Sequence, residues 1–105
     1  MPPSRKAIRL HKGARIDLSQ SVTYYRRNGG ERWALAFKQK VEDAFRTIAA
    51  DPGKFSSLPK YPRVKKVRLE KFPFFILFIE GLEFIWVIAV AHPKRQPEYW
   101  LKRLP

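Results

Sequence analysis

The sequence contains no cysteine and only two histidines, His11 and His92, which stand far apart. The chain therefore has neither a disulfide framework nor a thiolate nucleophile, which fits a protein of the reducing cytosol. Two histidines without a cluster of carboxylates supply too few ligands for a zinc site. We accordingly expect no metal, no cofactor and a cytoplasmic location.

The chain also lacks the motifs of nucleotide hydrolysis and of serine hydrolases. Gly29-Gly30 ends a predicted helix and is not followed by the Lys-Ser/Thr pair of a phosphate-binding loop. No serine has the context of a nucleophile elbow. The most apolar region, 72–91, nearly reaches membrane-spanning length, but Glu80 and Glu83 interrupt its centre, where carboxylates are costly in lipid. We interpret this region as two strands and expect no membrane association.

Positive charge is what the sequence has in excess. Its 22 lysines and arginines against nine acidic residues leave a net charge of +13 over 105 residues. A field of this sign attracts polyanions or an acidic protein partner. The length predicts one domain, 1–105, and 45% hydrophobic residues are enough for a modest core.

The first half of the chain has the apolar spacing of two amphipathic helices. Apolar residues recur every three or four positions over 14–27 and again over 31–50. Asn28-Gly29-Gly30 separates the two stretches, and a connection this short makes neighbouring helices antiparallel. Asp51-Pro52-Gly53 ends the second helix because the residue before a proline disfavours helical backbone angles. A proline-bounded loop is predicted over 55–62.

The second half changes to the period of strands. After a possible short strand over 6–11, alternation from Arg63 onward predicts a strand with one wet and mostly cationic face. The stretches 74–79 and 84–91 are apolar at nearly every position, and 80–83 has the length of a hairpin turn. The predicted class is α+β: an N-terminal antiparallel helical hairpin on a small, mainly antiparallel sheet, with a short C-terminal helix or turn.

One face of such a sheet is left without a cover, because a helical hairpin in so small a chain covers only the other. Two explanations stay open. Either the C-terminal residues Tyr99, Trp100 and Leu101 fold over that face, or a protein partner docks there. The strand side chains in question are Phe75, Leu77, Ile79, Ile85 and Val87.

Two groups of residues are candidates for chemistry. Lys66 and Arg68 share one strand face and tolerate each other's repulsion, which points to an anion that the chain itself lacks. The segment "HPKRQPEYWLKR" follows the last strand with a histidine, four cations and two aromatic residues. His92 and Arg95 directly follow the last strand and are expected to lie beside the face that carries Lys66 and Arg68. His92 and Arg95 are therefore our first candidates for function.

The order of motifs resembles a known family. In sequence order the motifs are "ARIDLSQSVTYY", "AFKQKVEDAFRTIAADPGKF", "VKKVRLEKFPFFILF" and "IWVIAVAHPKRQPEYWLKR". Over about Ala14 to Arg103 they resemble the ParE/RelE superfamily of type II toxin–antitoxin toxins, especially its ParE-like, plasmid-stabilisation branch. Each motif alone is weak, whereas the ordered set is fairly specific.

The resemblance implies a compact toxin that a cognate antitoxin holds inactive. An acidic, partly disordered antitoxin suits a toxin of this charge, because opposite charge speeds capture and a segment that folds on binding covers a large surface. We expect the toxin and antitoxin to form a hetero-oligomer. The expected antitoxin contacts are the five strand side chains above together with Arg63 and Lys65.

The resemblance leaves the toxin's target open between DNA gyrase and the ribosome. ParE-type members are associated with poisoning gyrase, and RelE-type members cleave messenger RNA on the ribosome. A metal-independent endoribonuclease needs a base, phosphate-binding cations and an acid. The candidates by position are Lys66, Arg68, His92, Arg95 and Tyr99, and the unperturbed pKa of a histidine, about 6.5, suits proton transfer.

Tyr99 is followed directly by Trp100, as in ParE-like sequences, which favours a toxin that acts by binding. A simple basic nucleic-acid-binding module is the remaining alternative. Such a module would lose affinity steeply with salt and would need no antitoxin.

Overall fold

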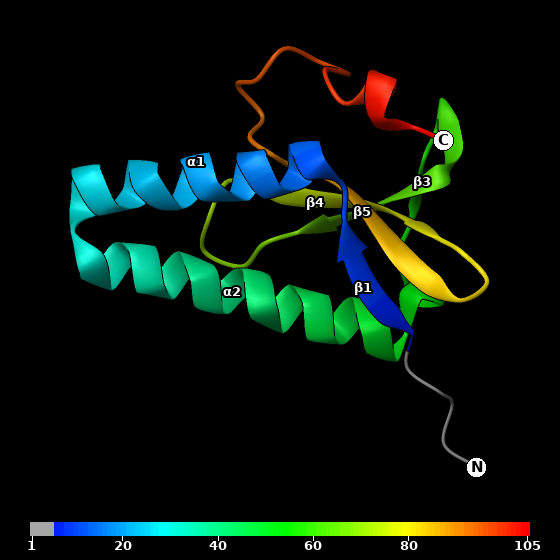
Figure 1. The fold of residues 1–105 in the computed structure, drawn as a ribbon, viewed down its shortest axis with the longest axis horizontal. Helices are drawn as coiled ribbons and strands as arrows, with labels where there is room; N and C mark the ends of the chain where they lie inside the picture. Colours follow the sequence, from blue (N-terminus) through cyan, green and yellow to red (C-terminus); the bar gives the residue numbers. More distant parts are fainter. Residues whose placement is uncertain (1–5) are drawn as a thin grey trace.

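The computed structural model describes residues 6–105 and has the predicted α+β architecture (Figure 1). A hairpin of two long helices packs on a five-stranded sheet, and a short C-terminal 3₁₀ turn ends the chain. Within the described residues no helix is both long and apolar enough to cross a bilayer. The elements in chain order are β1 (Ala7–Leu10), α1 (Lys12–Gly29), α2 (Glu31–Ala50), η1 (Pro52–Lys54), β2 (Ser57–Leu58), β3 (Tyr61–Arg68), β4 (Phe75–Glu80), β5 (Phe84–Ala91) and η2 (Leu101–Arg103).

The sheet has the strand order β1-β5-β4-β3-β2. Only β1 runs parallel to its neighbour, β5, and the remaining pairs are antiparallel. Leu77 pairs with Ala89 and Phe78 with Val87, so Ile88 is an extra residue in β5. This bulge shifts the alternation of β5, and Ile88 and Ala89 consequently join the same cluster of buried side chains.

The helical hairpin covers one face of the sheet. Gly30 joins the helices with a φ of 84°, a left-handed backbone that glycine adopts without a steric penalty. Phe37, Val41 and Ile48 of α2 are buried against strand residues such as Ile76 and Phe78. The helices therefore bury their apolar stripes against the sheet, as the sequence predicts.

The C-terminal segment, 92–105, covers the opposite face. Trp100 is buried with Val64, Leu77, Ile79 and Ile88, and Leu101 and Leu104 pack against the same cluster. In Figure 1 this segment, drawn in orange and red, passes from the end of β5 to the neighbourhood of β3. The sequence left open whether the C-terminal residues or a protein partner covers this face. In the structure the C-terminal segment covers it.

Element boundaries differ from the prediction by one or two residues at several ends, and two differences have a clear local cause. Helix α1 begins two residues early, because the Nδ1 atom of His11 accepts a hydrogen bond from the backbone N–H of Gly13 at 2.9 Å and caps the helix. The predicted loop over 55–62 also contains the short strand β2 and the first residues of β3, which pair with each other. Two-residue strands leave too little alternation for a sequence pattern to reveal.

Candidate functional site

A buried carboxylate joins the C-terminal segment to the rest of the fold. Asp17 lies on α1, and only 3% of its surface is exposed. Its Oδ2 atom accepts hydrogen bonds from Val90 N at 3.1 Å, Tyr99 Oη at 2.9 Å and Arg103 Nη1 at 2.7 Å. Arg103 Nη2 donates to Oδ1 at 3.2 Å, which makes the pair bidentate. Asp17 therefore links α1, β5 and the C-terminal segment.

Two arginines lie over the phenol ring of Tyr99. The guanidinium carbon of Arg95 lies 4.0 Å from the ring centroid and that of Arg103 lies 4.9 Å from it. Arg95 also approaches Asp17, with 3.5 Å between Nη1 and Oδ1. We call Asp17, Arg95, Tyr99 and Arg103 the Asp17 latch, because together they hold the C-terminal segment against α1.

The environment of Tyr99 makes its phenol a weaker acid than usual. Burial raises the pKa of Tyr99, and so do the negative charge of Asp17 and the hydrogen bond that the phenol donates to it. The nearby charges of Arg103 and Arg95 act in the opposite direction but do not outweigh these effects. A proton on Tyr99 is therefore held by Asp17 and is poorly placed for transfer to a leaving group.

Four of the five predicted catalytic candidates line one cavity of about 320 Å³ between the C-terminal segment and the sheet. Lys66 extends over the ring of Phe75, with 4.4 Å from Nζ to the centroid. The Nδ1 atom of His92 accepts a hydrogen bond from Lys94 N at 3.0 Å. The four candidates that line this cavity are Lys66, His92, Arg95 and Tyr99.

Arg68, the fifth candidate, does not line this cavity. It is the last residue of β3, pairs with Phe75 in the sheet and lines a different cavity beside Asp43 and Thr47 of α2. The sequence predicts that Lys66 and Arg68 share a strand face, but Lys66 lines the cavity beneath the C-terminal segment whereas Arg68 lines the one beside α2.

The predicted antitoxin contacts lie mostly inside the molecule. Leu77 and Ile79 are beneath the C-terminal segment, and Ile85 and Val87 are in the cluster between helices and sheet. Phe75 is partly buried at the edge of the C-terminal cluster. These apolar side chains thus have partners within the chain, and contact with an antitoxin at this face stays a prediction.

The two predicted charged contacts are placed differently from each other. Arg63 is exposed and lines a shallow cavity together with Leu104. Lys65 donates to the backbone oxygen of Pro52 at 3.2 Å and lies 3.9 Å from a carboxylate oxygen of Glu80.

Asp17 is a residue of this site that is not among the candidates predicted from the sequence. A signal was present, since a lone carboxylate stands in the apolar stripe of a predicted helix next to Leu18. Buried charges are paired in folded proteins, so this position called for a cationic partner elsewhere in the chain. Tyr99 and Arg103 supply the partners, and residues 6–105 hold no group of three or more side chains suited to a metal ion.

Comparison with solved structures identifies the class of fold. The chain is similar to a structure titled "Chromosomal ParDE TA system from P. aeruginosa", with a TM-score of 0.73 and 19% sequence identity. The match covers 86% of this chain and 98% of that chain. A comparison with curated proteins finds no significant match.

Comparison with protein families identifies the particular family. Residues 8–97 match the family described as the ParE toxin of the type II toxin–antitoxin system parDE. The chain belongs to the ParE toxin family. It is therefore the toxin of a type II pair, its partner is an antitoxin, and the resemblance seen in its motifs is confirmed.

Proposed function

We propose that this toxin acts by binding DNA gyrase and poisoning it, without cutting nucleic acid itself. Family membership supports the gyrase target, since poisoning of gyrase is the role associated with ParE-type toxins. The strong positive charge supports capture by an acidic antitoxin, because complementary charge accelerates association.

The observation that carries the proposal is the engagement of Tyr99 with Asp17. A nuclease of the RelE kind needs an acid that can release a proton to the leaving oxygen. Here the phenol donates to Asp17 at 2.9 Å, its pKa is raised, and Arg95 stacks on its ring. Arg68 lines another cavity. The engaged phenol is therefore unsuited to the acid's part, which supports a toxin that acts by binding.

One experiment separates the possible targets. The toxin is induced alone in a bacterial host, and DNA breaks, the DNA-damage response and the 5′ ends of messenger RNA are followed together. Gyrase poisoning predicts DNA breaks and intact transcripts. Ribosome-phased transcript ends without DNA breaks would overturn the proposal, and an unchanged growth rate would contradict the toxin assignment itself.

The second candidate is ribosome-dependent cleavage, and the shared cavity favours it. Lys66, His92 and Arg95 line that cavity, where an imidazole and two cations meet. In the nuclease case His92→Ala abolishes growth arrest while antitoxin binding persists. Under the gyrase proposal His92→Ala remains toxic, because the imidazole transfers no proton.

A further inference from the structure

Three arginines in the described part of the chain lie over aromatic rings, and one of these three has no carboxylate partner there. Arg95 and Arg103 both pair with Asp17. Arg9, on β1, lies over the ring of Phe84, with 4.7 Å between its guanidinium carbon and the ring centroid. Arg9 is exposed, and no ion pair among the described residues includes it. Its charge is therefore not neutralised within the described fold.

The ring beneath Arg9 belongs to a row of aromatic side chains beside the edge strand β1. Phe84 meets Trp86 edge-on at 5.8 Å, and Trp86 meets His11 edge-on at 5.9 Å. Trp86 also packs against the buried cluster beneath the C-terminal segment. Arg9 pairs with Trp86 in the sheet, so the side chains of these two residues share one face. The row holds the ring of Phe84 in place under the guanidinium.

A guanidinium that lies over a ring keeps its N–H groups free for another partner. The donors lie in the plane of the guanidinium, and their planar fork matches two oxygens of a phosphate. Attraction between the cation and the face of the ring also restricts the side chain, so less freedom is lost on binding. Arg9 is thus arranged in advance for a bidentate contact with an anion.

The start of the helix that follows β1 adds two more cations. Lys12 and Arg15 are exposed and stand three positions apart on α1, which places them on one side of the helix. The first turn of α1 contains no acidic residue, and the helix dipole disfavours cations there. These two positions therefore do not favour the stability of α1, and they add to the positive field after β1. We call Arg9, Lys12 and Arg15 the β1 edge cations.

The neighbouring β4–β5 hairpin carries too little negative charge to neutralise this edge. Glu80 pairs with Lys6 at 3.0 Å. Glu83 is exposed and takes part in no ion pair among the described residues. The three β1 edge cations therefore keep an excess of positive charge.

We propose that the β1 edge cations contact the phosphate backbone of the DNA duplex on which gyrase acts. Arg9 binds one phosphate through two N–H groups, and Lys12 and Arg15 face neighbouring phosphates. A duplex carries one negative charge for about every 1.7 Å of its axis, which matches several uncompensated cations near one another. An acidic protein segment fits less well, because protein partners bind through apolar anchors and Arg9 covers the ring of Phe84. This contact rests on the gyrase function proposed above.

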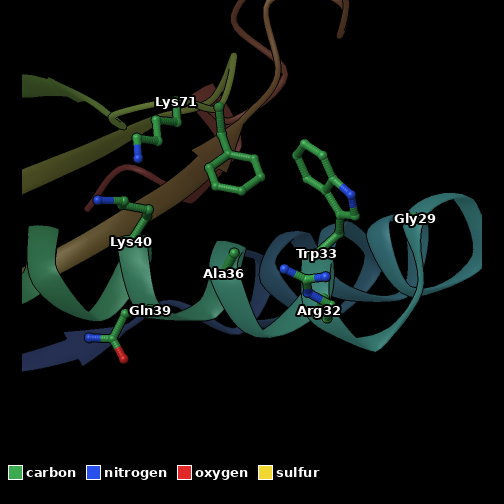
Figure 2. Close-up of a pocket in the computed structure, with 8 residues that line it drawn as sticks. Gly29, Arg32, Trp33, Ala36, Gln39, Lys40 and Lys71 are labelled. Carbon is green, nitrogen blue, oxygen red and sulfur yellow. The ribbon is translucent and has the colours of Figure 1, made fainter.

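Arg32 provides a matched control for Arg9. It is also exposed, and it lines an open groove on the side of α2, where Figure 2 shows it beside Trp33. The helical hairpin turn near Arg32 lies at the opposite end of α1 from β1 (Figure 1), and an 18-residue helix is about 27 Å long. Arg9→Ala and Arg32→Ala therefore remove the same charge from distant parts of the molecule.

Two further variants separate the arrangement of Arg9 from its charge. Arg9→Lys keeps the charge and loses the planar fork. Phe84→Leu keeps every charge and removes the ring beneath the guanidinium. Circular dichroism checks that each variant folds.

Binding of each purified toxin to a short, labelled DNA duplex of mixed sequence is measured by fluorescence anisotropy at several salt concentrations. Arg9→Ala is expected to bind about fivefold to tenfold more weakly, and Arg32→Ala to stay within about twofold. The slope of log affinity against log salt should fall by about 0.9 for the lost phosphate contact. Arg9→Lys should lie between Arg9→Ala and the unaltered toxin, and Phe84→Leu should bind about threefold more weakly.

A second measurement uses purified gyrase and closed circular DNA. Arg9→Ala should need several times more toxin than Arg32→Ala to produce the same amount of broken DNA. If the two variants bind DNA equally well, the β1 edge does not contact DNA, and the gyrase function still stands when both cause breaks. If the unaltered toxin causes no breaks but Arg9→Ala alone loses DNA affinity, the gyrase function fails and the phosphate contact stands.

Two other results would overturn DNA as the partner. One is tighter binding of the unaltered toxin to an RNA duplex than to the DNA duplex. The other is an Arg9→Ala variant that keeps its affinity for DNA and loses affinity for the antitoxin, because the β1 edge would then bind a protein.

Discussion

The two faces of the sheet are covered in different ways. On one face two helices bury an almost wholly apolar set of side chains, including Phe37, Ile48 and Phe78. On the other face 14 residues of mostly irregular chain cover a smaller apolar cluster around Trp100. That second cover is held by the buried Asp17 and its partners Tyr99 and Arg103.

The two covers are expected to contribute differently: the helices to the stability of the whole molecule, and the contacts of Asp17 to the position of the C-terminal segment. Apolar burial is roughly proportional to area and has little directionality, so the helix face stabilises the whole molecule. A buried carboxylate with four hydrogen bonds is directional, and removing a partner leaves a charge without compensation. We therefore expect changes at the helix face to lower global stability, and changes at the latch to act first on the C-terminal segment.

Phe37→Ala should have the largest effect. The ring of Phe37 is fully buried between α2 and the sheet and contacts Phe72 and Phe74. Truncation of a buried phenylalanine costs about 3–5 kcal/mol of unfolding free energy. Chemical denaturation measures this loss, and all regions should lose stability together. A loss below about 1 kcal/mol would show that the helix face does not dominate stability.

Asp17→Asn should have the next largest effect. An amide keeps the size of the side chain but leaves Arg103 without its carboxylate partner, which should cost about 2–3 kcal/mol. Hydrogen exchange should quicken first at residues 99–104, before it does in α2. The matched control is Asp43→Asn, because Asp43 pairs with Arg46 in solvent, and the loss of this exposed pair should change the free energy of unfolding far less. Equal effects of the two variants would contradict the importance of the latch.

Tyr99→Phe should have a smaller effect that depends on pH. Loss of the hydrogen bond to Asp17 is expected to cost about 1–2 kcal/mol at neutral pH. The folded state raises the pKa of Tyr99 above its ordinary value of 10.0, so the folded state holds that proton more tightly than the unfolded chain. The stabilisation is therefore fully present below pH 10.0 and is lost as pH rises beyond it.

Denaturation of both proteins between neutral and alkaline pH checks this sign. The stability difference between the unaltered chain and Tyr99→Phe should narrow above pH 10.0. Tyr25 and Tyr61 also have raised pKa values, and they remain in both proteins, so their contributions cancel. A difference that stays constant through this range would show that Asp17 does not hold the phenol proton.

Leu82→Ser should have the smallest effect. Leu82 is at the tip of the hairpin between β4 and β5 with 97% of its surface exposed, and it belongs to neither face. Its replacement should change the free energy of unfolding by less than about 0.5 kcal/mol. Thermal unfolding is sufficient to measure this. A larger loss would mean that the tip contacts a part of the molecule assigned here to solvent.

Local patterns in the sequence predicted most of the elements and only part of the site. Helix α2 and strand β5 have the predicted bounds. A long apolar stripe at helical spacing is typical of a helix, and a short run rich in β-branched residues is typical of a buried strand. The cover of the second face depended on Asp17 meeting Tyr99 and Arg103, which are more than 80 positions away. No periodicity encodes such a distant contact. Lys66 and His92 line the same cavity because β3 and β5 both neighbour β4 in the sheet. Arg68 lines a different cavity because it is the last residue of β3, and the sequence did not predict where that strand ends.

The most direct test of the central claim uses purified gyrase and closed circular DNA. The unaltered toxin and His92→Ala are both expected to cause broken DNA to accumulate, and prior addition of the antitoxin is expected to prevent it. Intact DNA in the presence of active toxin, with cleavage of messenger RNA on purified ribosomes that is lost in His92→Ala, would contradict that claim.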